Sequence, residues 1–211
     1  AAINEMRIRM GMLPDCTPEE IQGFYGPPLP EILKRYFPEH ETDRLAREVN
    51  RISVTFVPRF MRLTEGAVDT MRTLRGRGHR NYVVSSADGE DVCSQLNALG
   101  AYSVLDGVQT FLSQGNKNGE NSEEFKANVM LSEGILATQR RYSTVPKRLF
   151  MIGDTESDMQ SCVLAKEMVG DYVFDPADRP RIVSVLFDPQ KRNGHITADY
   201  KIAELRAVLY I

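Results

Sequence analysis

Apolar and polar positions follow two different patterns along the chain. Residues 1–63 show helical spacing of apolar positions and no convincing strand, with breaks at Gly11 to Pro14 and at Gly26 to Pro30. Thr17-Pro-Glu-Glu20 predicts a helix start, because Thr17 can cap a helix and proline suits its first turn. We therefore expect residues 1–63 to form a small all-helical domain.

From residue 64 onward, short apolar runs alternate with amphipathic segments. Helices are predicted at 66–74, 90–99, 122–141 and 158–166, and strands at 81–85, 103–105 and 148–152, with further short apolar runs at 172–174 and 183–187. The polar, glycine-rich run 114–121 predicts a surface loop. Strands that alternate with helices indicate an α/β domain with a doubly wound parallel sheet over residues 64–211.

Composition and charge exclude several classes of partner. The 26 basic and 29 acidic residues give a net charge of -3, and no basic run is dense enough to predict a nucleic-acid partner. No apolar run reaches the roughly 18 residues of a membrane span. Three distant cysteines, Cys16, Cys93 and Cys162, without a C-x-x-C pair favour a reducing, cytoplasmic location. The isolated His40, His79 and His195 are given no role.

An acidic loop follows one of the predicted strands. The apolar run from Arg148 to Ile152 leads into Gly153, and Asp154 and Asp158 follow at a spacing of four residues. In open α/β sheets ligands lie beyond the carboxyl ends of the strands, where Asp154 is expected. Two close carboxylates repel unless a cation lies beside them, and Mg²⁺ takes carboxylate and phosphate oxygens. The loop predicts a magnesium site; the alternative is that both acids only cap the next helix.

Two other segments could contact a phosphate. Ser85 and Ser86 end a predicted strand, where a hydroxyl and free backbone N–H groups suit a phosphate oxygen, although serine is also an ordinary turn residue. Lys126, at the start of the long predicted helix, could neutralise a phosphate and orient a carboxylate. A solvated surface lysine is the alternative there, and Lys117 in the polar loop competes for the same role.

Taken in order, these features resemble a known family. A strand ending in Ser85, a lysine at a helix start and a strand ending in Gly-Asp-x-x-x-Asp158 resemble motifs II, III and IV of the haloacid dehalogenase-like (HAD) hydrolase superfamily. The segment Gly26-Pro-Pro-Leu-Pro-Glu-Ile-Leu33 is similar to the helical cap domain of its phosphoglycolate phosphatase-like members, and Thr64 to Leu74 resembles the return to their core. The resemblance covers essentially all 211 residues, although Lys126 is not followed by the proline that often stands there.

The resemblance implies a Mg²⁺-dependent phosphatase that hydrolyses a small phosphorylated metabolite through an aspartyl-phosphate. By that resemblance Asp154 is a metal ligand and Asp158 its supporting acid at the same metal. Ser85, with Ser86 beside it, binds the phosphate, and Lys126 steadies the nucleophile and the transferring group. These roles are positioning and charge neutralisation, as phosphoryl transfer requires.

One motif of the family is missing from the chain. Its members carry the nucleophile and a general acid/base as D-x-D at the end of a first core strand, which lies between the strands that here end in Ser85 and Asp154. Asp175-Pro-Ala-Asp178 and Asp188 have the wrong spacing and follow the acidic loop. Without that strand, its two neighbours keep unpaired backbone groups in the core, and each such group costs about 1 to 3 kcal/mol. We therefore expect the strand and its D-x-D upstream of Ala1.

Three alternatives remain open at this point. The chain could be an inactive HAD-like binding or regulatory protein, completed by a partner's strand. It could be a phosphomutase of the same fold. It could also be a nucleotide-binding or receiver-type domain, which would lack a helical cap and would call for an early glycine-rich phosphate loop that we do not find. No feature of the sequence indicates an oligomeric state. In the cap, Leu29, Leu33, Tyr36 and Phe37 could face either its own core or the substrate.

Overall fold

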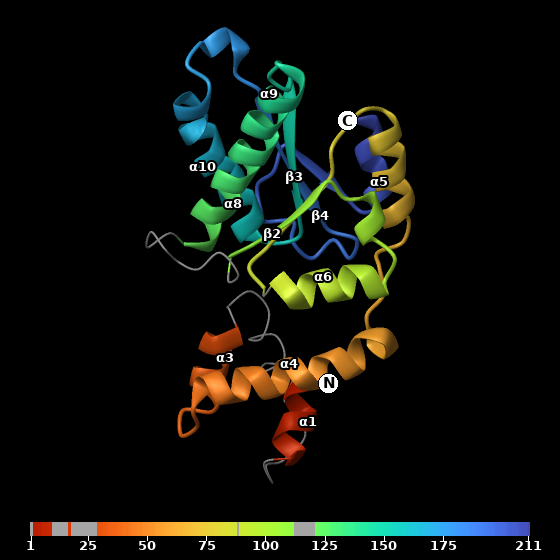
Figure 1. Cartoon of the computed structure of the whole chain (residues 1–211), viewed down its shortest axis with the longest axis vertical. Coiled ribbons are helices and arrows are strands. Elements are labelled where there is room, and N and C mark those ends of the chain that lie inside the picture. The colour runs from red at the N-terminus through yellow and green to blue at the C-terminus, as the bar shows by residue number, and fades with distance from the viewer. Residues whose placement is uncertain (1, 10–16, 18–28, 88, 112–120) are drawn as a thin grey trace. The chain divides into compact units, whose positions relative to one another are not determined.

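The computed structural model describes residues 2–9, 17, 29–87, 89–111 and 121–211 (Figure 1). The chain divides into two compact units, one made of residues 1–63 and 86–103 and the other of residues 64–85 and 104–211. The chain passes from the first unit to the second between Leu63 and Thr64, and the later segment 86–103 belongs again to the first unit. Within the described residues, no helix combines the length and the apolar character needed to cross a bilayer.

The first unit is helical throughout its described part. It contains α1 (Ala2–Arg9), α3 (Leu29–Tyr36), α4 (Thr42–Phe60) and α6 (Gly89–Ala98). Both α1 and α3 pack against α4, and their shared core contains Met6, Leu33, Phe37, Leu45, Val49 and Ile52. Leu29 and Tyr36 pack against the same cluster, so the apolar residues of α3 face the core of their own unit.

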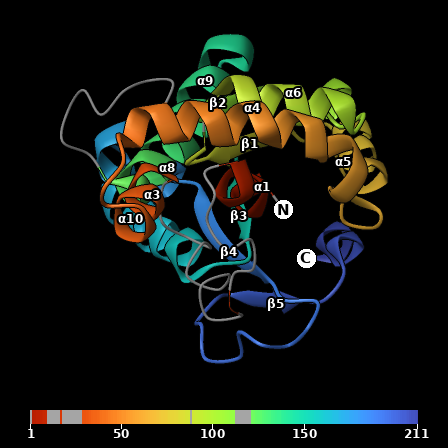
Figure 2. The ribbon, with the colours of Figure 1, turned by 90° about the horizontal axis from the view of Figure 1, so that it is seen from below.

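The described residues of the second unit contain five parallel strands in two separate sheets. In the first sheet β1 (Tyr82–Ser85) pairs with β2 (Gly107–Thr110), and Ser85 lies opposite Thr110. The second sheet has the order β3 (Arg148–Gly153), β4 (Arg181–Phe187) and β5 (Tyr200–Ile202). Figure 2 shows β3, β4 and β5 in that order, with β1 and β2 on the β3 side. In the described residues, β3 therefore has a strand partner on its β4 side only.

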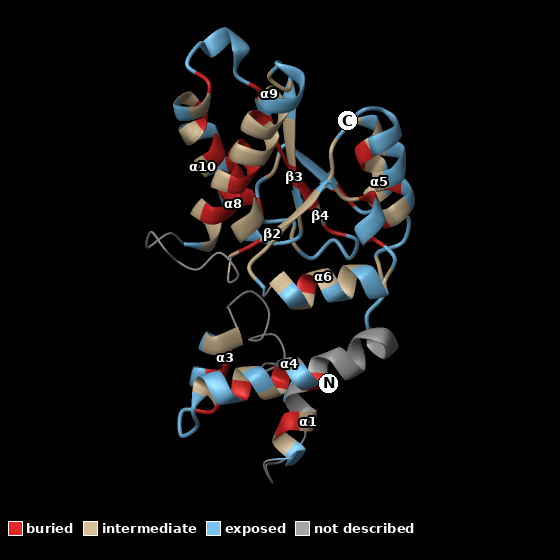
Figure 3. Cartoon of the chain, viewed as in Figure 1, coloured by how far each residue is buried: buried red, intermediate tan, exposed pale blue. Residues whose placement is uncertain are grey.

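Helices cover both faces of the three-stranded sheet. On one face, Met151 of β3 packs in a core with residues of α8 (Ser122–Leu131) and α10 (Glu156–Tyr172), and buried residues run along both helices in Figure 3. On the other face, Phe150 packs with Leu74 of α5 (Ala67–Gly76) and with the short helix η4 (Leu205–Tyr210). This arrangement confirms the predicted α/β fold with parallel strands between helices.

The predicted helix at 122–141 is interrupted by a wider turn. A π-helical segment, Ser132–Leu136, joins α8 to α9 (Ala137–Tyr142). A side chain at Gly134 would collide with Leu149 of β3, so this glycine lets the helix approach the strand closely.

Several local predictions are corrected by the structure. Residues 103–105 do not form a strand: Tyr102–Val104 is a single 3-10 turn, and the strand lies further on at β2. The Asn81 side chain donates to the Val104 carbonyl oxygen at 3.1 Å, which holds the turn in place. The apolar run 172–174 begins with Tyr172, the last residue of α10, and the apolar run 183–187 lies in β4. The short strand β5 was not predicted. Except for Thr17 itself, the predicted helix start at Thr17 to Glu20 lies outside the described residues.

Candidate active site

The acidic loop lies where β3 ends and α10 begins. Asp154 follows the last residue of β3, and its side chain is exposed. Its carboxylate makes no hydrogen bond or ion pair with the described residues. Asp154 is therefore an available oxygen ligand at the carboxyl end of a parallel strand, where ligands of such sheets bind.

Asp158 is held in place by the start of α10. Thr155 caps this helix, and its hydroxyl oxygen accepts from the Asp158 backbone N–H at 3.2 Å. In return, Oδ2 of Asp158 accepts from the Thr155 hydroxyl at 2.7 Å and from its backbone N–H at 3.2 Å. This reciprocal capping box fixes the carboxylate beside the loop. Asp158 therefore does cap α10, as the alternative interpretation expected, but only its Oδ2 takes part in the cap and Oδ1 does not.

Lys126 reaches that second oxygen from a different helix. Its Nζ lies 2.8 Å from Oδ1 of Asp158, and the two side chains are only 9% and 15% exposed. The lysine is therefore not a solvated surface residue. The pair brings together two residues that lie 32 positions apart in the sequence, as the assignment of Lys126 and Asp158 to one site requires. The competing Lys117 lies outside the described residues.

Gly153 is required by the position of Asp158. A Cβ atom added at Gly153 would collide with the Asp158 side chain. The strand end and the helix start are thus packed against each other through this glycine, and any larger residue would displace the carboxylate. The glycine belongs to the geometry of the site because it lets Asp158 lie against the end of β3.

A second loop, which the sequence did not reveal as part of the site, supports the acidic loop. Asp188 follows β4, is buried, and accepts from the backbone N–H groups of Arg192 and Asn193 at 2.9 and 2.8 Å. The Asn193 side chain then donates to the Asp154 carbonyl oxygen at 3.1 Å. The loop after β4 therefore fixes the backbone of Asp154, while leaving its carboxylate free.

The remaining predicted site residues are placed as follows. Ser85 ends β1, a strand that α8 contacts, and it is partly buried. The division between the two units falls between Ser85 and Ser86, so only Ser85 is described together with the acidic loop. The geometry joins Lys126, Asp158 and the loop of Asp154, and Ser85 lies on the neighbouring sheet.

Two of the acids considered as substitute nucleophiles, Asp175 and Asp188, make local hydrogen bonds in the structure. Asp175 caps a short helix by accepting from the Ala177 backbone N–H at 2.9 Å, and both oxygens of Asp188 are engaged in its loop. Cys162 is also excluded, because burial raises the pKa of its thiol to about 12. Among the described residues, the site holds the Lys126 cation and the carboxylates of Asp154 and Asp158, and the resemblance assigns both carboxylates to the metal rather than to nucleophilic attack.

The donor set fits a magnesium ion only in part. Among the described residues, no group of three or more His, Cys, Asp or Glu side chains gathers as it would around a metal ion. Mg²⁺ is usually held by one or two carboxylates together with water and substrate phosphate, and the free Asp154 carboxylate provides one of these. Asp158 retains only the lone pairs that Lys126 and Thr155 leave unused. The residues present thus form part of a magnesium site.

These features define an α/β protein whose candidate site lies at the carboxyl edge of a parallel sheet. A comparison with protein families matches residues 1–169 to the haloacid dehalogenase-like hydrolases. The chain therefore belongs to the haloacid dehalogenase-like hydrolase family, as its motifs suggested. A search of curated proteins finds none that matches the chain.

Solved structures show the same fold at low sequence identity. A protein described as a predicted phosphoglycolate phosphatase from Haemophilus somnus has a TM-score of 0.68 at 12% identity, covering 99% of this chain and 87% of its own. A HAD-type hydrolase from Bacillus subtilis, solved bound to magnesium, has a TM-score of 0.65 at 14% identity, covering 99% and 88%. A structure assigned as a β-phosphoglucomutase from Thermotoga maritima has a TM-score of 0.63 at 17% identity, with the same coverage.

Proposed function

We propose that this protein is the greater part of a Mg²⁺-dependent phosphatase that hydrolyses a small phosphorylated metabolite. The reaction passes through an aspartyl-phosphate, and the nucleophile lies on a strand outside the 211 residues. The observation that carries the proposal is the shielded contact between Lys126 and Asp158 beside the free carboxylate of Asp154. A cation and a free carboxylate fixed at the carboxyl edge of a parallel sheet suit phosphoryl transfer better than they suit a structural role.

Each residue has a role in this proposal. Lys126, held by Asp158, neutralises charge on the transferring phosphoryl group and orients the attacking carboxylate. Ser85 donates a hydrogen bond to a phosphate oxygen, and Asp154 is the ligand that would hold Mg²⁺. The metal, when bound, supplies charge stabilisation at the phosphoryl oxygens. The helical first unit acts as a cap that restricts access to the site.

The pairing of the strands is consistent with a further strand, outside the 211 residues, that carries the nucleophile. Within the described part, β1 pairs only with β2 and β3 only with β4, yet both strands belong to one compact unit. Parallel strands of a doubly wound sheet are normally buried and paired on both sides. A parallel strand between β1 and β3 would pair with both and would end beside the acidic loop, where a nucleophile is needed.

The test uses the protein translated from the complete reading frame. We expect it to hydrolyse p-nitrophenyl phosphate with Mg²⁺ and to lose this activity with excess EDTA. Asp154→Asn should lower kcat/KM by roughly 100-fold or more, because it removes a charged ligand at the metal. Asp171→Asn, an exposed acid of α10 with no described partner, is the matched control and should change nothing. Equal activity of the two variants would refute the role of Asp154.

Assays of the same complete protein on other phosphate esters separate two further candidate functions. No turnover by the complete protein on any phosphate ester would favour a binding or regulatory protein, which the lack of an identifiable nucleophile in the described residues makes a real alternative. A phosphomutase is supported by the similar structure assigned as a β-phosphoglucomutase. Conversion of a sugar 1-phosphate into its 6-phosphate, rather than release of inorganic phosphate, would identify that activity.

A further inference from the structure

A second charged site lies between helices of the first unit. A pocket of about 710 Å³ is lined by residues of α1, of α4 and of the turn before α4. Four of the lining residues are arginines, Arg9 on α1 and Arg44, Arg47 and Arg51 on α4. The volume lies within the range of sites that bind small organic molecules and is far larger than a single inorganic anion needs.

The arginines share one face of α4 because of their spacing. Residues 44, 47 and 51 are three and four positions apart, so they form one row on the helix surface. The neighbouring row, Leu45, Val49 and Ile52, is buried in the core of the unit together with Met6 of α1. Met6 and Leu45 also line the pocket, which therefore has apolar side chains at its base and guanidinium groups around them.

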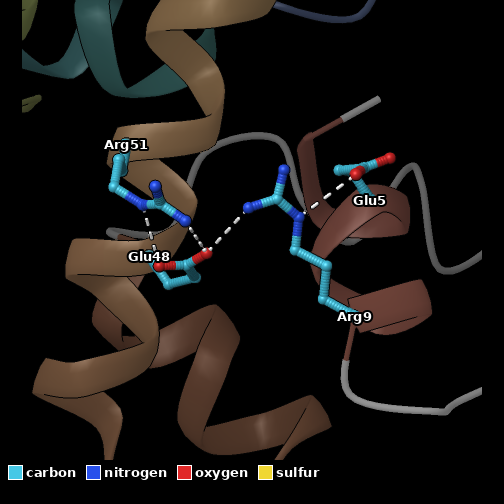
Figure 4. A network of polar contacts seen from close by, with 4 residues as sticks. All are labelled: Glu5, Arg9, Glu48 and Arg51. Atoms are coloured by element: carbon cyan, nitrogen blue, oxygen red, sulfur yellow. Dashed lines mark hydrogen bonds and ion pairs between the residues drawn. The ribbon is translucent and has the colours of Figure 1, made fainter.

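One glutamate orients two of the four guanidinium groups (Figure 4). Glu48 accepts from Arg51 at 2.7 and 3.1 Å and from Arg9 at 3.1 Å, and Arg9 also donates to Glu5 at 3.1 Å. The hydrogen bonds from Arg51 lower the pKa of the Glu48 carboxyl, so the glutamate remains charged. Arg9 and Arg51 are thus fixed on opposite helices by a carboxylate between them.

Among the described residues, the other two guanidinium groups have no counter-charge. Arg44 and Arg47 make no hydrogen bond or ion pair with any described residue. Four arginines and two glutamates, Glu41 and Glu48, give the lining a net charge of +2. Like charges three and four residues apart on a helix destabilise it, so a bound anion would stabilise this arrangement. The guanidinium fork matches phosphate and carboxylate oxygens in pairs.

We infer that this pocket is a binding site for an organic phosphate with at least two negative charges and an apolar or planar body. The phosphate pairs with Arg44 and Arg47, and the body lies on Met6 and Leu45. A planar ring can also stack on a guanidinium group. Binding at this pocket requires neither Mg²⁺ nor a nucleophile, so it does not rest on the proposed phosphatase activity.

The experiment titrates the 211-residue protein with ADP by calorimetry, in EDTA and at low salt. We expect a dissociation constant at or below about 1 mM for ADP and no measurable binding of adenosine, which has the ring without the charge. The double variant Arg44→Ala/Arg47→Ala should weaken ADP binding by about tenfold or more, since charged hydrogen bonds are lost. Arg44→Lys/Arg47→Lys keeps the positive charges but lacks the guanidinium fork, so its affinity for ADP should lie between those of the wild type and the double alanine variant.

A charge-matched control separates a site from a general charge effect. Lys34→Ala/Arg35→Ala removes two positive charges from exposed positions of α3 that do not line the pocket, and it should leave ADP binding unchanged. The inference is overturned if ADP does not bind at 5 mM, a concentration of about five times the expected limit. It is equally overturned if the Arg44/Arg47 variant binds as tightly as the wild type, or if the control loses as much affinity.

Discussion

At the scale of single residues, the contact between Lys126 and Asp158 differs in kind from the other ion pairs of the second unit. Its two side chains are almost fully shielded from solvent, whereas those of Lys166 and Asp199 are 46% and 33% exposed. A shielded charge that loses its partner is costly because water cannot replace the partner. Exposed pairs contribute little, since water and salt screen them.

This contrast gives a prediction about stability. Lys126→Met should lower the free energy of unfolding by about 2 to 3 kcal/mol, because Asp158 is left partly buried with only its Thr155 donors. Lys166→Met, the matched change at the exposed pair, should cost less than about 1 kcal/mol. Urea denaturation followed by circular dichroism measures both. Equal losses in the two variants would show that the Lys126 pair is not shielded as described.

Gly153 gives a second prediction at this scale. Gly153→Ala should destabilise the protein by about 1 to 3 kcal/mol, because the added methyl group collides with Asp158 and forces it away from Lys126 and Thr155. Gly76→Ala is the matched control: nothing lies within 4 Å of the added atom, and alanine favours the helix by up to about 1 kcal/mol. Thermal unfolding of both variants should shift the midpoints in opposite directions. A neutral Gly153→Ala would contradict the close approach.

The sequence could predict part of this site and not the rest. Asp154 and Asp158 follow an apolar strand at a spacing that local geometry explains, so they can be found without a structure. Asn193 cannot be found in this way, because it lies 39 positions from Asp154 in the sequence. It donates to the Asp154 carbonyl oxygen only because Asp188 holds the loop that carries it. The spacing of Asp188 in the sequence excludes it as the nucleophile and indicates no other role. Its signal, an aspartate-proline pair directly after a strand, indicates a turn but not what the turn supports.

At the scale of elements, the edge of the three-stranded sheet is secured by a carboxylate. Asp199 precedes β5 and accepts from the backbone N–H and the hydroxyl of Ser184 in β4, at 2.8 and 2.9 Å, and from Lys166 of α10 at 3.2 Å. Its own backbone N–H donates to the Ser184 hydroxyl at 2.9 Å. These bonds tie the segment that leads into β5 both to the central strand and to a covering helix.

The same carboxylate predicts a pH dependence. The Ser184 backbone N–H that donates to Asp199 lowers the pKa of this carboxyl below its ordinary value. A lowered pKa stabilises the fold above the unfolded value of about 3.9, and this share is lost as the pH falls through the folded value. Asp199→Asn should cost about 1 kcal/mol at pH 7 and flatten the loss of stability below pH 4. Denaturation between pH 7 and 3 measures it; Asp171→Asn should leave the profile unchanged.

Elements were predicted well where one segment carries its own pattern. The predicted strands at 81–85 and 148–152 are confirmed as β1 and β3, and the helix at 66–74 as α5. The strand expected at 103–105 was wrong because Val104 is buried by a turn that Asn81 holds, while the true strand, Gly107–Thr110, begins with a glycine and carries a glutamine. β5 has only three residues, so its pairing with β4 defines it and local pattern does not.

At the scale of the whole second unit, the break between β1 and β3 leads to a prediction about backbone dynamics. β4 has strand partners on both sides, but among the described residues β3 pairs only with β4. Amides of β3 that point away from β4 should therefore exchange with solvent at least about tenfold faster than those of β4, because no strand covers them. In the protein translated from the complete reading frame they should become as protected as β4, since the added strand pairs with them. Hydrogen exchange measured by NMR on both proteins, at the same pH and temperature, tests this.

β4 is the internal control for this comparison. Residues 185 and 186 of β4 pair with strands on both sides, and their amides report the global stability in each protein, so a general stabilisation would slow β3 and these β4 amides together. Selective slowing of β3 and β1 would instead mark a strand inserted between them. If β3 is already as protected as β4 in the 211-residue protein, the backbone N–H groups of β3 that point away from β4 are hydrogen-bonded without an added strand. The proposed strand, and with it the upstream nucleophile, would then lose its structural support.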